Sequence, residues 1–287
     1  MKDRLLKFLI HLIGLKNAYR FGRALYVRAR KECPNNISIN GELFVQEQFI
    51  KQFCLSERVV IFDVGANIGE WTSAFINRIC QIGSSQKIQF HLFEPVKQTF
   101  SVLQERLRGY PSTNNIILNN MALSDVAGFD SMFIIEGSSG INSFHSPTLE
   151  EPTTVQQIEK STLDDYCKTN NISEIHFIKV DTEGHDYCVI KGGLELFLNE
   201  KILVCQFEYN LRWIYGRHFL KDVFDLFIET PYKIGKITPY TVEFYNSWHP
   251  ELERFFEGNY LIVHKKAIHC FEHHTGDFDQ FWLYQKE

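Results

Sequence analysis

The chain has 287 residues, of which 44% are hydrophobic and 14% aromatic, so it can bury a large core and is not a disordered protein. Thirty Lys and Arg against 35 Asp and Glu give a net charge of −5, which disfavours general nucleic-acid binding because duplex phosphates need a basic excess. The seven cysteines form no C-x-x-C pair, so we expect reduced thiols and a cytoplasmic location rather than disulfides or a zinc site.

The first 31 residues differ in charge from the rest of the chain. They carry nine basic residues and one acid, a net charge of +8, and residues 5–15 are largely apolar around Lys7 and His11. That run is too short to cross a membrane, which takes about 20 apolar residues. The pattern predicts a basic amphipathic helix, which either lies peripherally on the anionic inner face of a membrane or docks on the following domain.

Short apolar runs alternate with helical stretches after residue 55. This alternation is typical of a mainly parallel, doubly wound sheet with helices on both faces. The seven predicted strands are 59–63, 88–94, 115–123, 175–181, 202–208, 232–237 and 259–264. The last two should form an antiparallel pair at one edge. The predicted helices are 69–80, 99–109, 161–170 with Ser161 as its N-cap, 185–199 and 219–228.

No repeat, low-complexity tract or linker divides the chain after residue 55. We therefore expect an N-terminal helical extension over residues 1–55 and one domain over residues 56–287. Within that domain, residues 126–160 are too long for a βα connection and are expected to form a lid or substrate wall. Residues 211–258 are a second candidate substrate region.

The strongest local signal is FDVGANIG, residues 62–69, in which a buried strand opens into a glycine turn before a helix. A dinucleotide fingerprint needs G-x-G-x-x-G, but Asn67 occupies the middle glycine position and Glu70 adds a negative charge to the first helical turn. Both features oppose a pyrophosphate, and there is no P-loop. The turn therefore predicts a nucleoside ligand without phosphates. S-adenosylmethionine fits, because it is cationic and carries a ribose for Glu94.

Five motifs in a fixed order connect the chain to one enzyme family. They are FDVGANIG (62–69), LFEP (92–95), NMALSD (120–125), STLDDYC (161–167) and IKVDTEGHDYCVIKGG (178–193). Through them the chain resembles the FkbM family of class I S-adenosylmethionine-dependent methyltransferases, over residues 58–210. The resemblance implies a Rossmann-like α/β fold and methyl transfer from S-adenosylmethionine to a hydroxyl of a sugar, glycan or natural product.

The same resemblance implies which residues hold the cofactor. The glycine turn would surround the methionine part, Glu94 would hold the ribose, and residues after the third strand would border the adenine. An alternative is that the glycines only permit a tight turn and that Asp125 only caps a helix. The cofactor-binding candidates are Asp63, Gly65, Ala66, Asn67, Gly69, Glu94, Pro95, Ser124 and Asp125.

Acid–base groups follow the fourth strand, beside the point of a doubly wound sheet where ligands bind. Methyl transfer to an alcohol needs a group that accepts the hydroxyl proton. Asp181 and Glu183 can face one side of the extended chain together, and either is a candidate general base, with His185 as a third. Lys179 is a candidate partner for a carboxylate or for the acceptor. The alternative is that the two acids only bind backbone N–H groups at the next helix start.

Residues that follow later strands are further candidates for substrate contacts. Glu208 and Asn210 end the fifth strand, where they predict a substrate contact or, together with Asp181, a Mg²⁺ site of oxygen ligands. We expect no other metal site. Trp248 and His249 predict an aromatic wall for a sugar ring.

Two other functions stay open from the sequence alone. A non-catalytic module could keep the nucleoside pocket and use the N-terminal segment for recruitment to a partner or membrane. A nicotinamide-dependent oxidoreductase shares the fold but needs a phosphate-compatible loop. Methylation of nucleic-acid bases is disfavoured, because residues 181–184 read DTEG rather than [DNS]-P-P-[YF]. The expected partner is a small-molecule or glycan acceptor, and no nucleic acid.

Overall fold

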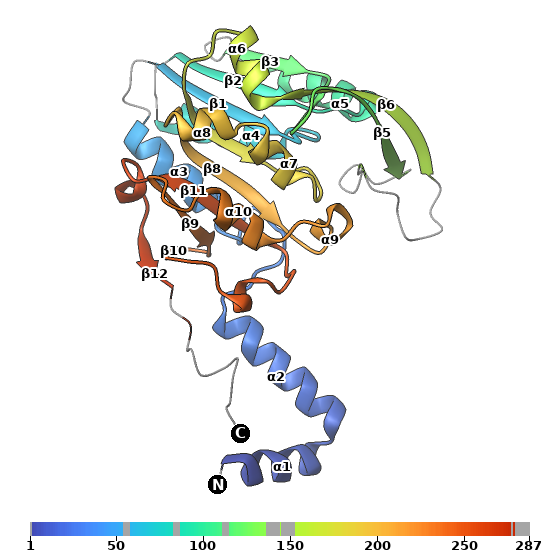
Figure 1. Cartoon of the computed structure of the whole chain (residues 1–287), viewed down its shortest axis with the longest axis vertical. Coiled ribbons are helices and arrows are strands. Elements are labelled where there is room, and N and C mark those ends of the chain that lie inside the picture. Colours follow the sequence, from blue (N-terminus) through green and yellow to red (C-terminus); the bar gives the residue numbers. More distant parts are fainter. Residues whose placement is uncertain are drawn as a thin grey trace.

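The computed structural model describes residues 2–53, 58–82, 87–110, 115–135, 144, 153–276 and 278. Its body is a twisted sheet covered by helices, from which two N-terminal helices project (Figure 1). Of the predicted lid, residues 136–143 and 145–152 lie outside the described residues.

The central sheet has the order β12-β10-β9-β11-β8-β7-β1-β2-β3. Its parallel part consists of β3 (Asn115–Asn119), β2 (Lys87–Phe93), β1 (Arg58–Val64), β7 (Ile175–Val180) and β8 (Ile202–Tyr209). The predicted antiparallel pairing is confirmed, because β11 (Gly258–His264) lies between β8 and β9 (Tyr232–Ile237), antiparallel to both. The predicted place of this pair at the edge of the sheet is wrong. The predicted α/β fold with a mainly parallel core is confirmed.

The predicted number of seven strands is wrong. Within the described residues the central sheet has nine, because β10 (Val242–Tyr245) and β12 (His273–Thr275) extend it beyond β9. β10 is short and follows β9 through a tight turn, in which the backbone N–H of Thr238 donates to the carbonyl of Thr241. β12 consists of two histidines and a threonine, so it carries no apolar pattern that would mark a strand.

Helices cover both faces of the sheet because successive residues of a strand point to opposite sides. In β1, Val60 and Phe62 pack toward one layer and Val59 and Ile61 toward the other. The first layer contains α6 (Leu163–Thr169), α7 (Asp186–Lys191), α8 (Leu194–Leu198) and α10 (Leu220–Leu226), with the short α9 (Trp213–Gly216) nearby. The second contains α3 (Glu42–Phe53), α4 (Glu70–Ile82) and α5 (Lys97–Leu107).

The predicted strand over 115–123 is two strands in two different sheets. The chain leaves the central sheet after β3 and continues as β4 (Ala122–Ser124) in a three-stranded sheet of order β4-β6-β5. The side-chain amide of Asn120 stabilises the break by donating to the carbonyl oxygens of Glu94 and Pro95, at 2.9 and 3.0 Å.

Two predictions about helices are also wrong. The helix expected over 185–199 is broken into α7 and α8 at Gly192, where a β-carbon would overlap the carbonyl oxygen of Ser124. Ser161 lies in β6 (Thr153–Thr162), and Thr162 is the N-cap of α6 instead. Its hydroxyl accepts a hydrogen bond from the backbone N–H of Asp165 at 3.0 Å, which satisfies one of the open donors of the first helical turn.

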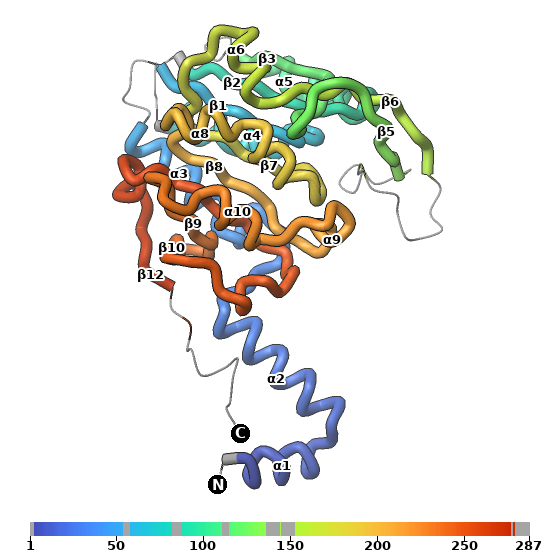
Figure 2. Tube along the Cα trace, viewed as in Figure 1, coloured from blue at the N-terminus to red at the C-terminus, as the bar shows by residue number. Residues whose placement is uncertain are grey.

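The described part of the predicted lid region is an antiparallel arm of two strands. β5 (Gly128–Ile135) pairs with β6 along its whole length, and the arm projects from the body beside α5 (Figure 2). Its inward-facing Met132 and Ile158 are buried against Val96 and Ala122. The base of the arm is therefore packed onto the carboxyl end of β2.

The N-terminal region contains two exposed helices and one buried one. α1 (Lys2–Ile13) and α2 (Leu15–Ala29) project from the body, and α2 has no buried residue. α3 belongs to the core: Phe49 is fully buried and packs edge-on against Phe177 at a ring distance of 5.1 Å. Among the described residues no helix is both long and apolar enough to cross a membrane. Two short 3₁₀ turns, Pro250–Leu252 and Ile268–Cys270, complete the described elements.

Candidate active site

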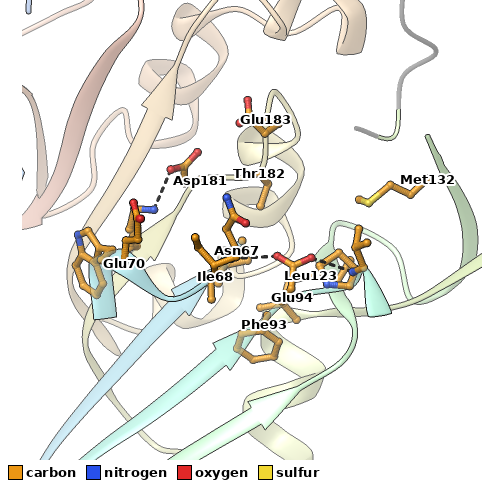
Figure 3. Close-up of a pocket in the computed structure, with 18 of the residues that line it drawn as sticks. Asn67, Ile68, Glu70, Phe93, Glu94, Leu123, Met132, Asp181, Thr182 and Glu183 are labelled. Atoms are coloured by element: carbon orange, nitrogen blue, oxygen red, sulfur yellow. Dashed lines mark hydrogen bonds and ion pairs between the residues drawn. The ribbon is translucent and has the colours of Figure 1, made fainter. Parts of the chain in front are cut away.

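A cavity of about 640 Å³ opens at the carboxyl ends of β1, β2 and β7. In the order of the sheet β1 has β2 on one side and β7 on the other, so the chain crosses in opposite directions from this strand, and ligands bind at such a switch point. Residues 35–37 and Glu42, which precede the sheet in the chain, form part of the cavity wall. Figure 3 shows the side chains around it.

The glycine turn after β1 forms the floor of the cavity. Gly65 and Ala66 donate their backbone N–H groups to the carbonyl of Phe93, at 3.0 and 2.9 Å, which ties the turn to β2. Gly65 has a φ of 79°, and a β-carbon there would overlap the carbonyl oxygen of Asp181. Glycine is therefore required both for its backbone conformation and for this close approach. Asn67 has a left-handed φ of 49° as well.

Glu94 lies at the end of β2 and is almost completely buried. Its two carboxylate oxygens each accept one backbone hydrogen bond, from Asn67 at 3.0 Å and from Val96 at 2.9 Å. Burial raises the pKa of Glu94 to about 7, although both hydrogen bonds favour the carboxylate. Each oxygen keeps a lone pair, so the side chain can still accept hydrogen bonds from a ligand's hydroxyl groups.

Lys179 is the centre of a buried cluster of charges beside the cavity. Its ammonium group contacts the Oδ2 atom of Asp181 at 2.8 Å. Burial alone would lower the pKa of Lys179, but the charges of Asp181, Asp63 and Glu42 outweigh it and hold the pKa above its ordinary value. Asp63 is fully buried and accepts a hydrogen bond from the hydroxyl of Thr72 at 2.6 Å, and burial raises its pKa.

Three of the four predicted acid–base residues lie at the cavity. Asp181, Glu183 and Lys179 line the cavity, and His185 does not: its Nε2 atom lies 2.9 Å from the hydroxyl of Ser124. Glu183 has a left-handed φ of 56° and forms an ion pair with Arg212. The Oδ1 atom of Asp181 accepts no hydrogen bond from the described part of the chain, so this oxygen is available to a ligand.

The two residues predicted to border the adenine do not lie at the cavity. Ser124 and Asp125 do not line the cavity, and Asp125 pairs with Lys191 at 3.0 Å. The wall is instead built from apolar side chains. They are Phe93, Leu123, Met132 and Phe144, the last two contributed by the predicted lid region. Among the other predicted cofactor residues, Gly65, Ala66, Asn67, Glu94 and Pro95 line the cavity, and Asp63 and Gly69 do not.

Glu208 and Asn210 lie next to the cavity without lining it. Glu208 is buried, and its carboxylate accepts hydrogen bonds from the amides of Asn35 at 2.9 Å and of Asn210 at 2.6 Å. Asn210 thus directs its NH₂ group, which cannot bind a cation, toward Glu208. No group of three His, Cys, Asp or Glu side chains within the described ranges could hold a metal ion.

The predicted substrate region 211–258 contributes no residue to the described cavity. The indole N–H of Trp248 donates to Glu253 at 3.0 Å. The ring of His249 stacks on Phe278 at 4.4 Å. Both rings therefore pack within the fold rather than facing the cavity.

Glu42 was missed by the sequence analysis. It begins α3 and accepts hydrogen bonds from the side chains of Asn40 and Gln206, both at 2.7 Å, and burial raises its pKa. An acid in the first turn of a helix is common, so nothing marked it as part of a site. The only available signal was its position on the same helical face as the apolar Val45 and Phe49.

The charged residues that line the cavity are five acids and one lysine. Lys179 is paired with Asp181, Glu183 with Arg212 and Glu70 with Arg106, so among the described residues Glu42 and Glu94 are the lining acids without an ion-pair partner. Such a surface attracts a cation and repels a pyrophosphate. Together with the free lone pairs of Glu94 and the apolar wall around Leu123, the cavity fits S-adenosylmethionine, which carries a sulfonium, an ammonium, a ribose and an adenine.

Comparison with known proteins gives one match at the level of a family. The model of the methyltransferase FkbM domain matches residues 63–234. No curated protein sequence matches the chain.

Solved structures with a similar backbone include methyltransferase FkbM from Methylobacillus flagellatus KT, at 18% sequence identity and a TM-score of 0.45. The match covers 72% of this chain and 44% of that one. Another is the SAM-dependent methyltransferase from Agrobacterium tumefaciens, at 8% sequence identity and a TM-score of 0.41. This match covers 78% of this chain and 62% of that one. A third is the CMeT domain of the citrinin polyketide synthase, at 10% sequence identity and a TM-score of 0.40. This match covers 77% of this chain and 51% of that one. The chain thus spans less than half the length of the first of these.

Proposed function

Because the chain belongs to the methyltransferase FkbM domain family, we propose that it transfers the methyl group of S-adenosylmethionine to a hydroxyl oxygen of a sugar, glycan or glycosylated natural product. The observation that carries the proposal is the carboxylate of Asp181. It lies inside an acidic cavity, is held by Lys179 through one oxygen, and presents the other to the ligand space. A hydroxyl acceptor needs such a proton acceptor, because an alcohol is a poor nucleophile at neutral pH.

Three features of the cavity would hold the cofactor. The lone pairs left on Glu94 would accept hydrogen bonds from the ribose hydroxyls. The turn at Gly65 and Asn67 would lie against the methionine part, and the side chains around Leu123 would cover the adenine. Bound in this way, S-adenosylmethionine supplies a methyl group on a positively charged sulfur, which is open to attack by an oxygen.

Asp181 and Lys179 would then handle the proton of the acceptor. The ion pair at 2.8 Å fixes the carboxylate of Asp181, so its Oδ1 atom can receive a hydrogen bond from the acceptor hydroxyl. As the new C–O bond forms and the S–CH₃ bond breaks, the hydroxyl proton passes to Oδ1 and from there to water. Glu183 is less suited to this step, because its carboxylate is already paired with Arg212.

A polar part of the cavity wall supports a polyhydroxyl acceptor. Asn35, Asn36 and Glu42 line the cavity there, and they offer amide donors and acceptors and a carboxylate. A sugar presents several hydroxyl groups that need such partners when they leave water. This supports a saccharide more than an apolar alcohol.

The test is to identify the atom that receives the methyl group. The full chain is incubated with S-adenosylmethionine carrying a ¹³C-labelled methyl group and a panel of monosaccharides and their aryl glycosides. Proton–carbon correlation spectra of the products should show an O-methyl resonance. A label on nitrogen or carbon, or turnover with RNA in place of sugars, would overturn the proposal.

A matched pair of variants links the reaction to the cavity. Asp181→Asn should still bind S-adenosylmethionine in calorimetric titration and lose methyl transfer. Asp225→Asn also removes an aspartate paired with a lysine, Lys221, but on the exposed face of α10, and should transfer at the normal rate. Equal activity of the two variants would exclude Asp181 as the proton acceptor.

A further inference from the structure

Exposed apolar side chains are concentrated in the two N-terminal helices. Of the 22 large apolar residues that are exposed in the described part of the chain, ten lie between Leu5 and Leu25. Leu12 and Leu15, on either side of the joint at Gly14, are 69% and 80% exposed. Such a density of uncovered apolar surface on one short segment is typical of an interaction site.

The same helices carry the strongest positive charge of the chain. Residues 2–29 contain seven basic residues and one acid, a net charge of +6. In α1 the polar residues Asp3, Lys7 and His11 recur every four positions and share one face, and Lys7 pairs with Asp3 at 2.8 Å. Arg4 borders this face beside His11, and the leucines, isoleucines and Phe8 occupy most of the remaining circumference. α1 is therefore an amphipathic helix with a basic polar side.

The far end of the segment is fixed to the body. Near the C-terminus of α2 the hydroxyl of Tyr26 donates to Glu251 at 3.2 Å, and Arg30 contacts Glu243 at 3.5 Å. α1 lies across the opposite end of α2, away from the body (Figures 1 and 2). With 15 residues, α2 is roughly 22 Å long. It acts as a stalk that holds α1 at a distance from the cavity.

We propose that α1 and the first turn of α2 bind the surface of an anionic lipid bilayer. The apolar face of α1 lies among the acyl chains just below the headgroups, and its basic residues contact the anionic headgroups. At 12 residues α1 is too short to span a bilayer, so it lies in the plane of the surface. α2 leads from the bilayer to the methyltransferase body.

Charge argues against a second copy of the chain as the occupant. Pairing α1 with its own copy would bring two segments of charge +6 together. On the body, the largest run of exposed apolar residues lies between Leu211 and Phe219. That run contains Arg212 and Arg217 and no acid, so it repels the basic helices as well. A bilayer supplies apolar and anionic surface at once.

The proposal is tested by sedimentation of the full chain with vesicles, a readout that is independent of methyl transfer. The protein should pellet with vesicles of mixed phosphatidylcholine and phosphatidylglycerol, more weakly at high salt, and remain in the supernatant with phosphatidylcholine alone. Each basic residue near an anionic surface changes the partition by roughly fivefold, so Arg4→Gln with Lys16→Gln should weaken binding roughly 25-fold. Pelleting that ignores lipid charge would overturn the proposal.

A matched pair of double variants separates the apolar face from a general change in charge. Leu5→Glu with Leu12→Glu should abolish pelleting. Leu198→Glu with Ile228→Glu makes the same change at exposed apolar positions of the body and should leave it intact. Equal pelleting of the two double variants refutes a role for α1. So does sedimentation of the wild-type chain as a dimer in the absence of lipid, if the α1 variant converts it to a monomer.

Discussion

Replacing Glu94 with glutamine should stabilise the free protein increasingly as the pH rises. Burial raises the pKa of Glu94 in the folded protein to about 7, from an ordinary value of 4.5. Between these pH values the folded state keeps a proton that the unfolded chain has released. The wild-type protein therefore loses stability as the pH rises from 4.5 through 7, whereas glutamine does not titrate.

The size of the effect follows from the two pKa values. One unit of difference corresponds to about 1.4 kcal/mol, so a shift from 4.5 to about 7 costs the wild-type protein about 3 kcal/mol at high pH. Roughly 2.5 kcal/mol of this should appear between pH 5 and 8. Glutamine also loses one of the two backbone hydrogen bonds, because its amide nitrogen cannot accept, but this loss of about 1 kcal/mol does not depend on pH.

Urea unfolding of both proteins at several pH values measures the difference. Subtracting the two free energies of unfolding removes the titration of all groups that the proteins share. As a control, Glu70→Gln removes a carboxylate that lies at the rim of the cavity and is 69% exposed, and it should change the free energy by less than about 0.5 kcal/mol at every pH. If the difference between Glu94→Gln and wild type is the same at every pH, the reasoning is wrong.

Four further outcomes are expected. Calorimetric titration should show that S-adenosylmethionine binds about tenfold more tightly at pH 8 than at pH 6, because a cation favours ionised Glu94, and the Glu94→Gln variant should not follow this trend. In steady-state assays, Asp181→Asn should lower the turnover number about 100- to 10,000-fold. Thermal unfolding should show that Gly65→Ala costs more than about 2 kcal/mol. Gly109→Ala, with no atom within 4 Å, should cost no more than about 1 kcal/mol. Phe49→Ala should cost about 3–5 kcal/mol if α3 is part of the core.

The parallel half of the sheet could be predicted because its strands are buried on both faces. Every residue of β1 after Arg58 is buried, so the sequence there is an apolar run, interrupted only by Asp63, that ends at a glycine turn. β12 is exposed along its length and is held by backbone pairing with β10. Because this pairing does not depend on side chains, no sequence pattern predicts the strand. The break between α7 and α8 depends on the approach of Ser124 to Gly192, a contact between distant parts of the chain.

The cavity was predictable where its residues follow strand ends and unpredictable where they meet across the fold. Glu94 and Asp181 each end a strand of the parallel sheet, and such ends meet at one edge. Glu42 reaches the same place through Gln206, which is 164 positions away. The proposed preference for Asp181 over Glu183 rests on the position of Arg212, because an ion pair formed by folding distinguishes two carboxylates that are two residues apart.

The two exposed helices tolerate more substitutions than the body does. No side chain of α2 is buried, so its residues other than Tyr26, which bonds Glu251, need only keep a pattern of apolar and basic positions, and many exchanges preserve that pattern. α3 must fill a particular space beside Phe177, so its residues tolerate few exchanges. We expect the first 29 residues to change quickly in evolution and to be exchangeable between enzymes, whereas the segment from Asn35 onward changes only together with the cavity.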